Sequence, residues 1–132
     1  MYDTDYALHV ATGNGKSVTV SNSFIKGWSS FGGEYKSLSF ENVDFGRGGL
    51  QETAESPLFG AAIRLYDSAS FSSCAFRDDF KIDVHSSVPA DTVITLTDCK
   101  IVLSGDTEVS VTSANITQLL NDADDAKYFN IR

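Results

Sequence analysis

The sequence is poor in the residues that mark disordered, fibrous or membrane-spanning chains. Its two prolines and ten glycines in 132 residues are too few for a disordered or collagen-like polypeptide. Basic residues are scarce as well, ten against 18 acidic ones, and the resulting net charge of −8 argues against nucleic acid and anionic membranes as partners. No apolar run approaches the roughly 20 residues that span a bilayer, and the first residues lack the basic and apolar regions of a signal peptide. Without a charged linker or low-complexity break, we expect a single domain.

What the sequence does contain is an eight-residue pattern that occurs four times, at residues 18–25, 38–45, 69–76 and 94–101. In each copy the first, third and eighth residues are apolar, the second is Ser or Thr, and the fifth is Asn, Ser or Asp. Alternation over the first three residues is typical of a strand with one buried face. The fifth residue breaks the alternation, and Asn and Asp tolerate bend conformations. We therefore expect the chain to turn a corner at the same place in each copy, at Asn22, Asn42, Ser73 and Asp98.

The spacing between copies is 20, 31 and 25 residues, which suits solenoid coils with loops of unequal length. Coils stacked at about 4.8 Å place equivalent residues above one another, and neighbouring coils then cover each other's core. Four inward ladders follow: Val18, Leu38, Ala69 and Ile94; Val20, Phe40, Phe71 and Leu96; Ser23, Val43, Cys74 and Cys99; Ile25, Phe45, Phe76 and Ile101.

A second family of alternating segments covers residues 6–10, 62–66, 81–85 and 108–112. It predicts two more inward ladders: Leu8, Ile63, Ile82 and Val109; Val10, Leu65, Val84 and Val111. In the same strands, Arg64 next to Asp83 and Lys81 next to Glu108 are expected to form cross-strand ion pairs, each worth about 0.2–1 kcal/mol.

Strands joined by corners and loops are the pattern of a right-handed parallel β-helix, and residues 6 to about 116 resemble the pectin-lyase-like superfamily of single-stranded β-helices. That superfamily includes polysaccharide lyases and hydrolases, bacteriophage tailspikes and other virion proteins. The resemblance implies an all-β fold, a short single-stranded right-handed parallel β-helix with a small C-terminal cap. We expect the coils over residues 1–116 and the capping segment over residues 117–132, beginning with a short helix at Thr117.

Two segments between the repeats supply the candidate binding residues. Residues 26–33 carry the only tryptophan, which either stacks on a sugar or protein partner from a loop or packs over the coil edge. Residues 46–60 form the longest excursion, and insertions of this kind in solenoids often bind. The candidates are Trp28 with the nearby Tyr35, and Arg47, Leu50 and Phe59.

The outward positions of the repeated strand carry almost only hydroxyl groups: Thr19, Ser21, Ser39, Glu41, Ser70, Ser72, Thr95 and Thr97. Glycoside hydrolysis needs two carboxylates about 5–9.5 Å apart, and Glu41 is the sole acid in this set. We therefore assign no catalytic residue, metal or cofactor. If a sugar or metal site exists, the candidate carboxylates are Asp44, Asp78 and Asp79.

Cysteine is scarce too, and the two that occur fall on one inward ladder. Cys74 and Cys99 lie on adjacent predicted coils, at a separation that suits a disulfide. Side chains stacked in parallel seldom present the required dihedral angle, so buried free thiols that behave as small hydrophobic groups are the simpler interpretation. Two cysteines indicate no cellular compartment.

The small size, the shortage of paired carboxylates and the flat hydroxyl-rich face favour a non-enzymatic structural or attachment module. Residues 1–5 offer no segment that could cap the N-terminal end. We therefore expect identical subunits, as a trimer, or a larger assembly to cover this end, or the chain to be a piece of a longer β-helix. The family resemblance suggests a virion decoration, fibre or spike component, hence a virion or extracellular location. The alternative is a polysaccharide-binding or polysaccharide-degrading β-helix, a fragment of a tailspike depolymerase or a pectinase-like enzyme. Ice binding ranks third, because the hydroxyl array is irregular.

Overall fold

The computed structural model describes residues 8–10, 17–32, 37–47, 61–77 and 79–132, and in this part the chain is all-β with three short 3-10 helices and no α-helix. The strands are β1 (Leu8–Val10), β2 (Ser17–Lys26), β3 (Trp28–Phe31), β4 (Ser37–Gly46), β5 (Ala62–Leu65), β6 (Ala69–Ser72), β7 (Ala75–Arg77), β8 (Lys81–Val84), β9 (Ile94–Thr97), β10 (Lys100–Val102), β11 (Glu108–Ser110) and β12 (Phe129–Ile131). The 3-10 helices are η1 (Ser104–Asp106), η2 (Ile116–Leu119) and η3 (Ala123–Tyr128).

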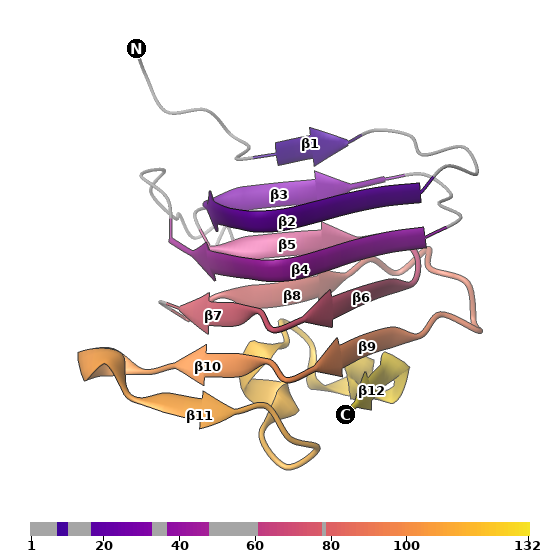
Figure 1. Cartoon of the computed structure of the whole chain (residues 1–132). Helices are drawn as coiled ribbons and strands as arrows, with labels where there is room; N and C mark the ends of the chain where they lie inside the picture. The colour runs from indigo at the N-terminus through magenta and orange to yellow at the C-terminus, as the bar shows by residue number, and fades with distance from the viewer. Residues whose placement is uncertain (1–7, 11–16, 33–36, 48–60, 78) are drawn as a thin grey trace, which may run out of the picture.

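The strands form two sheets that enclose one core, and every strand pair except β10–β11 is parallel (Figure 1). Sheet A has the order β1-β3-β5-β8, and every pair in it is parallel. In sheet B, β2 pairs with β4, β4 with β6 and β7, and these with β9 and β10, again in parallel. From β1 to β10 the chain alternates between the sheets, so that each passage adds a strand beside the preceding one.

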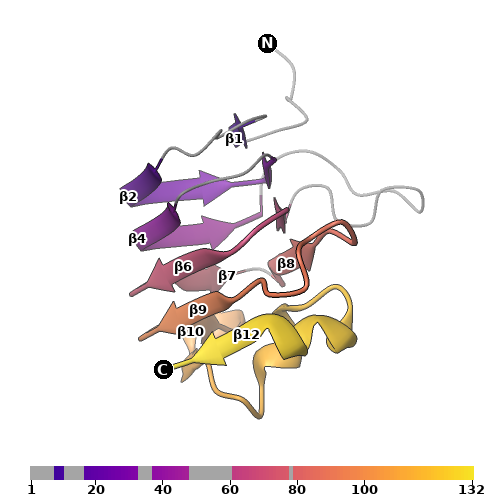
Figure 2. The same ribbon diagram turned by 90° about the vertical axis from the view of Figure 1, so that its right-hand side faces the viewer.

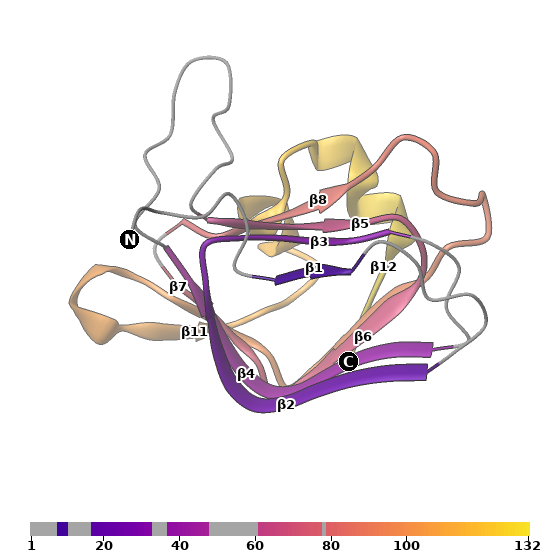
Figure 3. The ribbon, with the colours of Figure 1, turned by 90° about the horizontal axis from the view of Figure 1, so that it is seen from above.

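Sheet B bends along a line of four residues in the left-handed region. Their φ angles lie between 52° and 54°, and the bend is visible in β2 and β4 when the stack is seen from above (Figure 3). The Asn42 side chain donates from Nδ2 to Oδ1 of Asn22 at 2.9 Å, which links two neighbouring corners. The residues are those predicted from the repeat: Asn22, Asn42, Ser73 and Asp98.

The core is built from the ladders that the repeat predicts. Val20 pairs with Phe40, Phe40 with Phe71, and Phe71 with Leu96. The rings of Phe40 and Phe71 stack with centroids 4.8 Å apart, and two ladders further along Phe45 and Phe76 stack at 5.2 Å. Parallel pairing in register therefore turns a sequence repeat into columns of like side chains.

Sheet A differs from the prediction in two of its members. The segment β3, expected as a loop, is a strand between β1 and β5, where Ser29 lies between Leu8 and Ile63 in register. The segment β11, expected in this sheet, pairs antiparallel with β10 in sheet B, and Val109 is 38% exposed instead of joining the ladder of Ile82. The cause is a reversal at Gly105 and Asp106, whose φ angles of 79° and 62° return the chain onto β10.

The C-terminal segment continues both sheets at the far end of the stack (Figure 2). Leu120 bridges Ile82 in parallel beside sheet A, and β12 pairs in parallel with β9 in sheet B. The expected short helix is the 3-10 helix η2, which begins at Ile116 and buries Ile116 and Leu119. The division into coils at 1–116 and a cap at 117–132 stays a prediction.

Candidate functional site

The outer face of sheet B before the corner carries short hydroxyl side chains in register. Thr19, Ser39, Ser70 and Thr95 follow one another in a column, and Asn130 of β12 extends it beside Thr95. We call these residues, together with Ser21, Ser72 and Thr97, the hydroxyl face. At the β2 end of the column, Oγ1 of Thr19 and Oγ of Ser39 lie 3.3 Å apart.

The sequence predicts every member of this face except Asn130. That residue lies outside the repeats, in a segment expected only to cap the stack, and no pattern in the sequence links it to Thr95. Its side chains are short, and small hydroxyl groups lose little rotamer entropy when they are covered. The longer side chain of Glu41 lies among them, between Ser21 and Ser72 in register.

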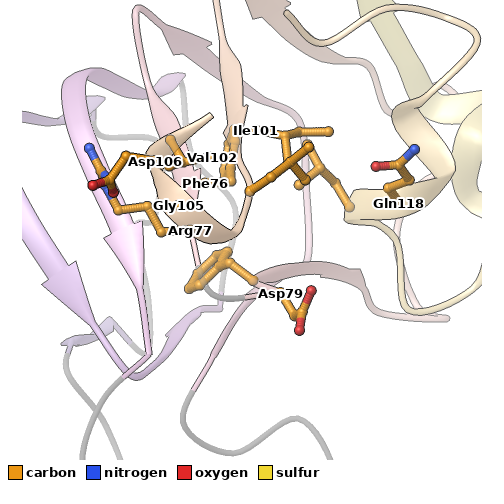
Figure 4. A pocket seen from close by; sticks show the side chains of 11 residues that line it. Phe76, Arg77, Asp79, Ile101, Val102, Gly105, Asp106 and Gln118 are labelled. Atoms are coloured by element: carbon orange, nitrogen blue, oxygen red, sulfur yellow. The ribbon is translucent and has the colours of Figure 1, made fainter. Parts of the chain in front are cut away.

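A pocket of about 440 Å³ opens at the other end of sheet B, between β10 and η2 (Figure 4). Its volume lies within the 300–1,000 Å³ range of small-molecule sites. Six apolar residues line it: Phe76, Phe80, Ile101, Val102, Leu103 and Leu119. We call the other lining residues, Arg77, Asp79, Gly105, Asp106 and Gln118, the rim.

Arg77 links this rim to β4 of sheet B. Its Nη2 lies 3.3 Å from Oδ2 of Asp44, and its Nη1 lies 4.0 Å from Oδ1 of the exposed Asp106. Asp79, also exposed, lies on the rim with a φ of 60°. The structure thus pairs one of the predicted carboxylates, Asp44, with Arg77 and places a second, Asp79, on the rim of the pocket. The third candidate, Asp78, lies outside the described residues.

The predicted binding aromatic Trp28 is not on an exposed loop. It begins β3 and is 4% exposed, with the guanidinium of Arg64 4.8 Å from the centre of its ring. Its burial agrees with the second of the two alternatives, packing over the coil edge. Its place in a strand was not predicted, because the segment Trp28–Phe31 contains two consecutive serines that hide its strand character. Arg47 is exposed directly after β4, and the other three candidates, Tyr35, Leu50 and Phe59, fall outside the described residues.

The outer face of sheet A holds the best-paired charges. Nε of Arg64 lies 2.7 Å from Oδ2 of Asp83, which confirms the predicted pair, and Asn121 donates to Oδ1 of Asp83 at 3.5 Å. Burial lowers the pKa of Arg64, but the hydrogen bond and charge of Asp83 outweigh it, so the pKa is raised overall. The guanidinium of Arg64 therefore stays charged and paired with Asp83.

The second predicted ion pair is wrong because β11 belongs to the other sheet. Lys81 donates from Nζ to the backbone oxygen of Gln118 at 2.7 Å. Oε2 of Glu108 instead lies 3.4 Å from Nζ of Lys100, its diagonal neighbour across the β10–β11 pair.

Cys74 and Cys99 are buried free thiols, as the simpler interpretation has it. Each Sγ lies near a backbone oxygen of the neighbouring strand, Cys74 at 3.5 Å from Phe40 and Cys99 at 3.3 Å from Phe71. The hydrogen bond with Cys99, together with burial, raises the pKa of Cys74. A thiol that holds its proton in this way is a weak nucleophile, which suits a packing role.

Within the described ranges, no three or more His, Cys, Asp or Glu side chains gather closely enough to hold a metal ion. The helices in that part of the chain are also too short to cross a membrane. Comparison with protein-family models, with curated proteins and with solved structures finds no match for this chain.

Proposed function

We propose that the two sheets form a short right-handed parallel β-helix, and that the chain is a non-enzymatic structural or attachment module. The alternation of the chain between two parallel sheets supports the helix, and the right hand is the one that parallel crossovers adopt in about 98% of cases. The four corner residues, whose φ angles lie between 52° and 54°, support it as well.

The hydroxyl face is the observation that carries the proposed role. Seven short Ser and Thr side chains share one flat surface of parallel strands, and Glu41 is the single charge among the outward positions predicted from the repeat. Neighbouring hydroxyls such as Thr19 and Ser39 lie within hydrogen-bond distance of each other, which reduces the cost of removing water from them. Such a face is suited to packing against a second flat protein surface.

An identical subunit is the partner that this face fits best. Three copies around a threefold axis bury one such face each and close the assembly, as most soluble oligomers do. A role in virion decoration, in a fibre or in a spike follows from the resemblance to β-helical virion proteins, and with it a virion or extracellular location.

The assembly state tests this proposal. We expect the native mass, measured by light scattering or sedimentation, to be a multiple of three times the 14.3 kDa of one chain. Thr95→Arg, within the hydroxyl face, should lower that mass, whereas Ser113→Arg, in an exposed turn, should not. A monomeric wild-type protein, or equal behaviour of both variants, would overturn the proposal.

Polysaccharide binding is the second candidate, and the pocket is the observation that favours it. Its rim offers the donors of Arg77 and Gln118 and the acceptors of Asp79 and Asp106 above an apolar wall, which is the mixture that sugar hydroxyls and ring carbons require. Glycan binding that Asp79→Ala abolishes would support this candidate. A monomer that shortens a polysaccharide chain would place it first.

A further inference from the structure

The rim of the pocket carries more negative than positive charge. Its charged residues are Arg77, Asp79 and Asp106. The guanidinium of Arg77 is shared between Asp44, whose Oδ2 lies 3.3 Å from Nη2, and Asp106, whose Oδ1 lies 4.0 Å from Nη1. Among the described residues that line this rim or pair with it, three carboxylates therefore share one guanidinium.

Asp79 is the rim carboxylate that has no counterion. Its side chain forms no ion pair with any residue of the described part. Figure 4 shows Asp106 beside Arg77, whereas Asp79 lies apart from both. Because Asp79 is exposed at the mouth of the pocket, its carboxylate can accept a charge-assisted hydrogen bond from a cationic ligand.

The two lysines on the strands beside the pocket are engaged elsewhere. Nζ of Lys81 donates to the backbone oxygen of Gln118 at 2.7 Å, and Nζ of Lys100 lies 3.4 Å from Oε2 of Glu108. Neither lysine is among the residues that line the pocket. The net charge of −8 over the whole chain adds to the negative potential there, which favours a cation as ligand.

The lining favours a sugar over a lipid. Leu103 is 45% exposed and offers apolar surface, whereas the other five apolar lining residues are at most 8% exposed. Gln118, also exposed, adds an amide that can both donate and accept hydrogen bonds. A small apolar area among several hydrogen-bonding groups matches a ring that carries hydroxyl groups on its edge and CH groups on its faces.

We propose that the pocket binds a glycan with free amino groups, such as a glucosamine polymer, and that Asp79 pairs with an ammonium group of this ligand. The inference rests on the second candidate function, glycan binding at the pocket, and names the class of glycan. A neutral glycan would leave the charge of Asp79 without a partner. A uronate polymer would bring further carboxylates to an acidic rim, and like charges in contact disfavour binding.

Three sugar trimers of different charge test the class of ligand. At about pH 6, where Asp is ionised and an amine is protonated, calorimetric titration of the full chain should show the glucosamine trimer binding about tenfold tighter than the N-acetylglucosamine trimer. This factor is the difference between a hydrogen bond to a charged partner and one to a neutral partner. The galacturonate trimer should bind most weakly, and added salt should reduce the preference for the amine.

Asp79→Asn and Asp91→Asn form a matched pair of variants, since each removes one negative charge. Asp91 lies in the exposed turn between β8 and β9, and Figure 1 shows this connection on the side opposite the β10–β11 hairpin. Asn tolerates the left-handed φ of 60° at position 79, so the turn keeps its backbone conformation. Asp79→Asn should remove the tenfold preference, and Asp91→Asn should keep it.

Equal affinity for the free and the acetylated amine would overturn the inference and leave the glycan candidate standing. Equal losses in the two variants would also overturn it, because the attraction would then come from the overall charge. If none of the three trimers binds, the inference and the glycan candidate fail together. The native mass decides the proposal for the hydroxyl face independently of all three results.

Discussion

The corner residue Ser73 provides the sharpest test of how the repeat determines the fold. Its φ is 54°, and it lies between Asn42 and Asp98 in the column of corners. The left-handed region costs ordinary L-residues about 1–2 kcal/mol, and Asn and Asp visit it most readily after Gly. Ser73 is exposed, so a substitution there changes backbone preference without changing the core.

Two substitutions should move the free energy of unfolding in opposite directions. Ser73→Asn lowers the backbone cost and places a third amide in the column beside Asn42, which already donates to Asn22 at 2.9 Å. The lower cost of the left-handed backbone and one exposed hydrogen bond should together raise the free energy of unfolding by about 0.5–1.5 kcal/mol. Ser73→Val adds a β-branched side chain to a left-handed residue and should cost about 1–2 kcal/mol.

Urea unfolding followed by fluorescence of the single buried tryptophan, Trp28, measures this difference. The matched control is Ser72, the preceding residue, which lies in the extended strand β6. There the order should reverse, because strands favour Val over Asn. If Asn and Val at position 73 agree within about 0.5 kcal/mol, or if both sites rank them alike, the corner reasoning is refuted.

Three further predictions use the same unfolding measurement. Phe71→Ala, in the stacked core, should cost about 3–5 kcal/mol, while Phe24→Ala, on the exposed edge, should cost under about 0.5 kcal/mol in the monomer; equal losses would contradict the assigned burial. Arg64→Ala leaves the carboxylate of Asp83 without its cation and should cost about 1–3 kcal/mol, monitored by circular dichroism because Arg64 contacts the tryptophan ring. Burial and acidic neighbours raise the pKa of Asp125, so the folded state binds this proton more tightly and loses stability as pH rises through the Asp range. Asp125→Asn should therefore stabilise the protein at pH 7, with the gain vanishing at about pH 3, below the usual Asp pKa near 3.9; a gain that persists there has another cause.

The repeat was predictable because its information is local. Each copy buries the same positions of one short segment, so alternation and the corner residue can be read without knowing the neighbours. This is why the ladder through Phe40 and Phe71 and the corner at Ser73 agree with the structure.

The failures occur where a segment carries a weak or ambiguous pattern. The strand β3 places Ser29 at an inward position with 0% exposure, so its alternation is invisible in the sequence. The strand β11 alternates well, but alternation says only that a strand has two faces and not which sheet it joins. The reversal at Gly105 makes that choice.

The candidate sites likewise differ in how far the local sequence pattern predicts them. The hydroxyl face was predictable because its residues are the outward positions of the repeat, but Asn130 joins it only through the pairing of β12 with β9. The pocket draws on β7, β10, η2 and the turns between them, and of its rim only Asp79 was among the predicted residues. No local pattern connects Asp79 with Gln118.

The sequence alone determined the strand repeat, its corners and the inward ladders through its four copies, because burial and backbone preference act on neighbouring residues. The tertiary structure alone decided the sheet that β11 joins, the burial of Trp28 and the pocket beside η2. Those features depend on contacts between segments far apart in the chain, and such contacts leave no periodic trace in any one segment.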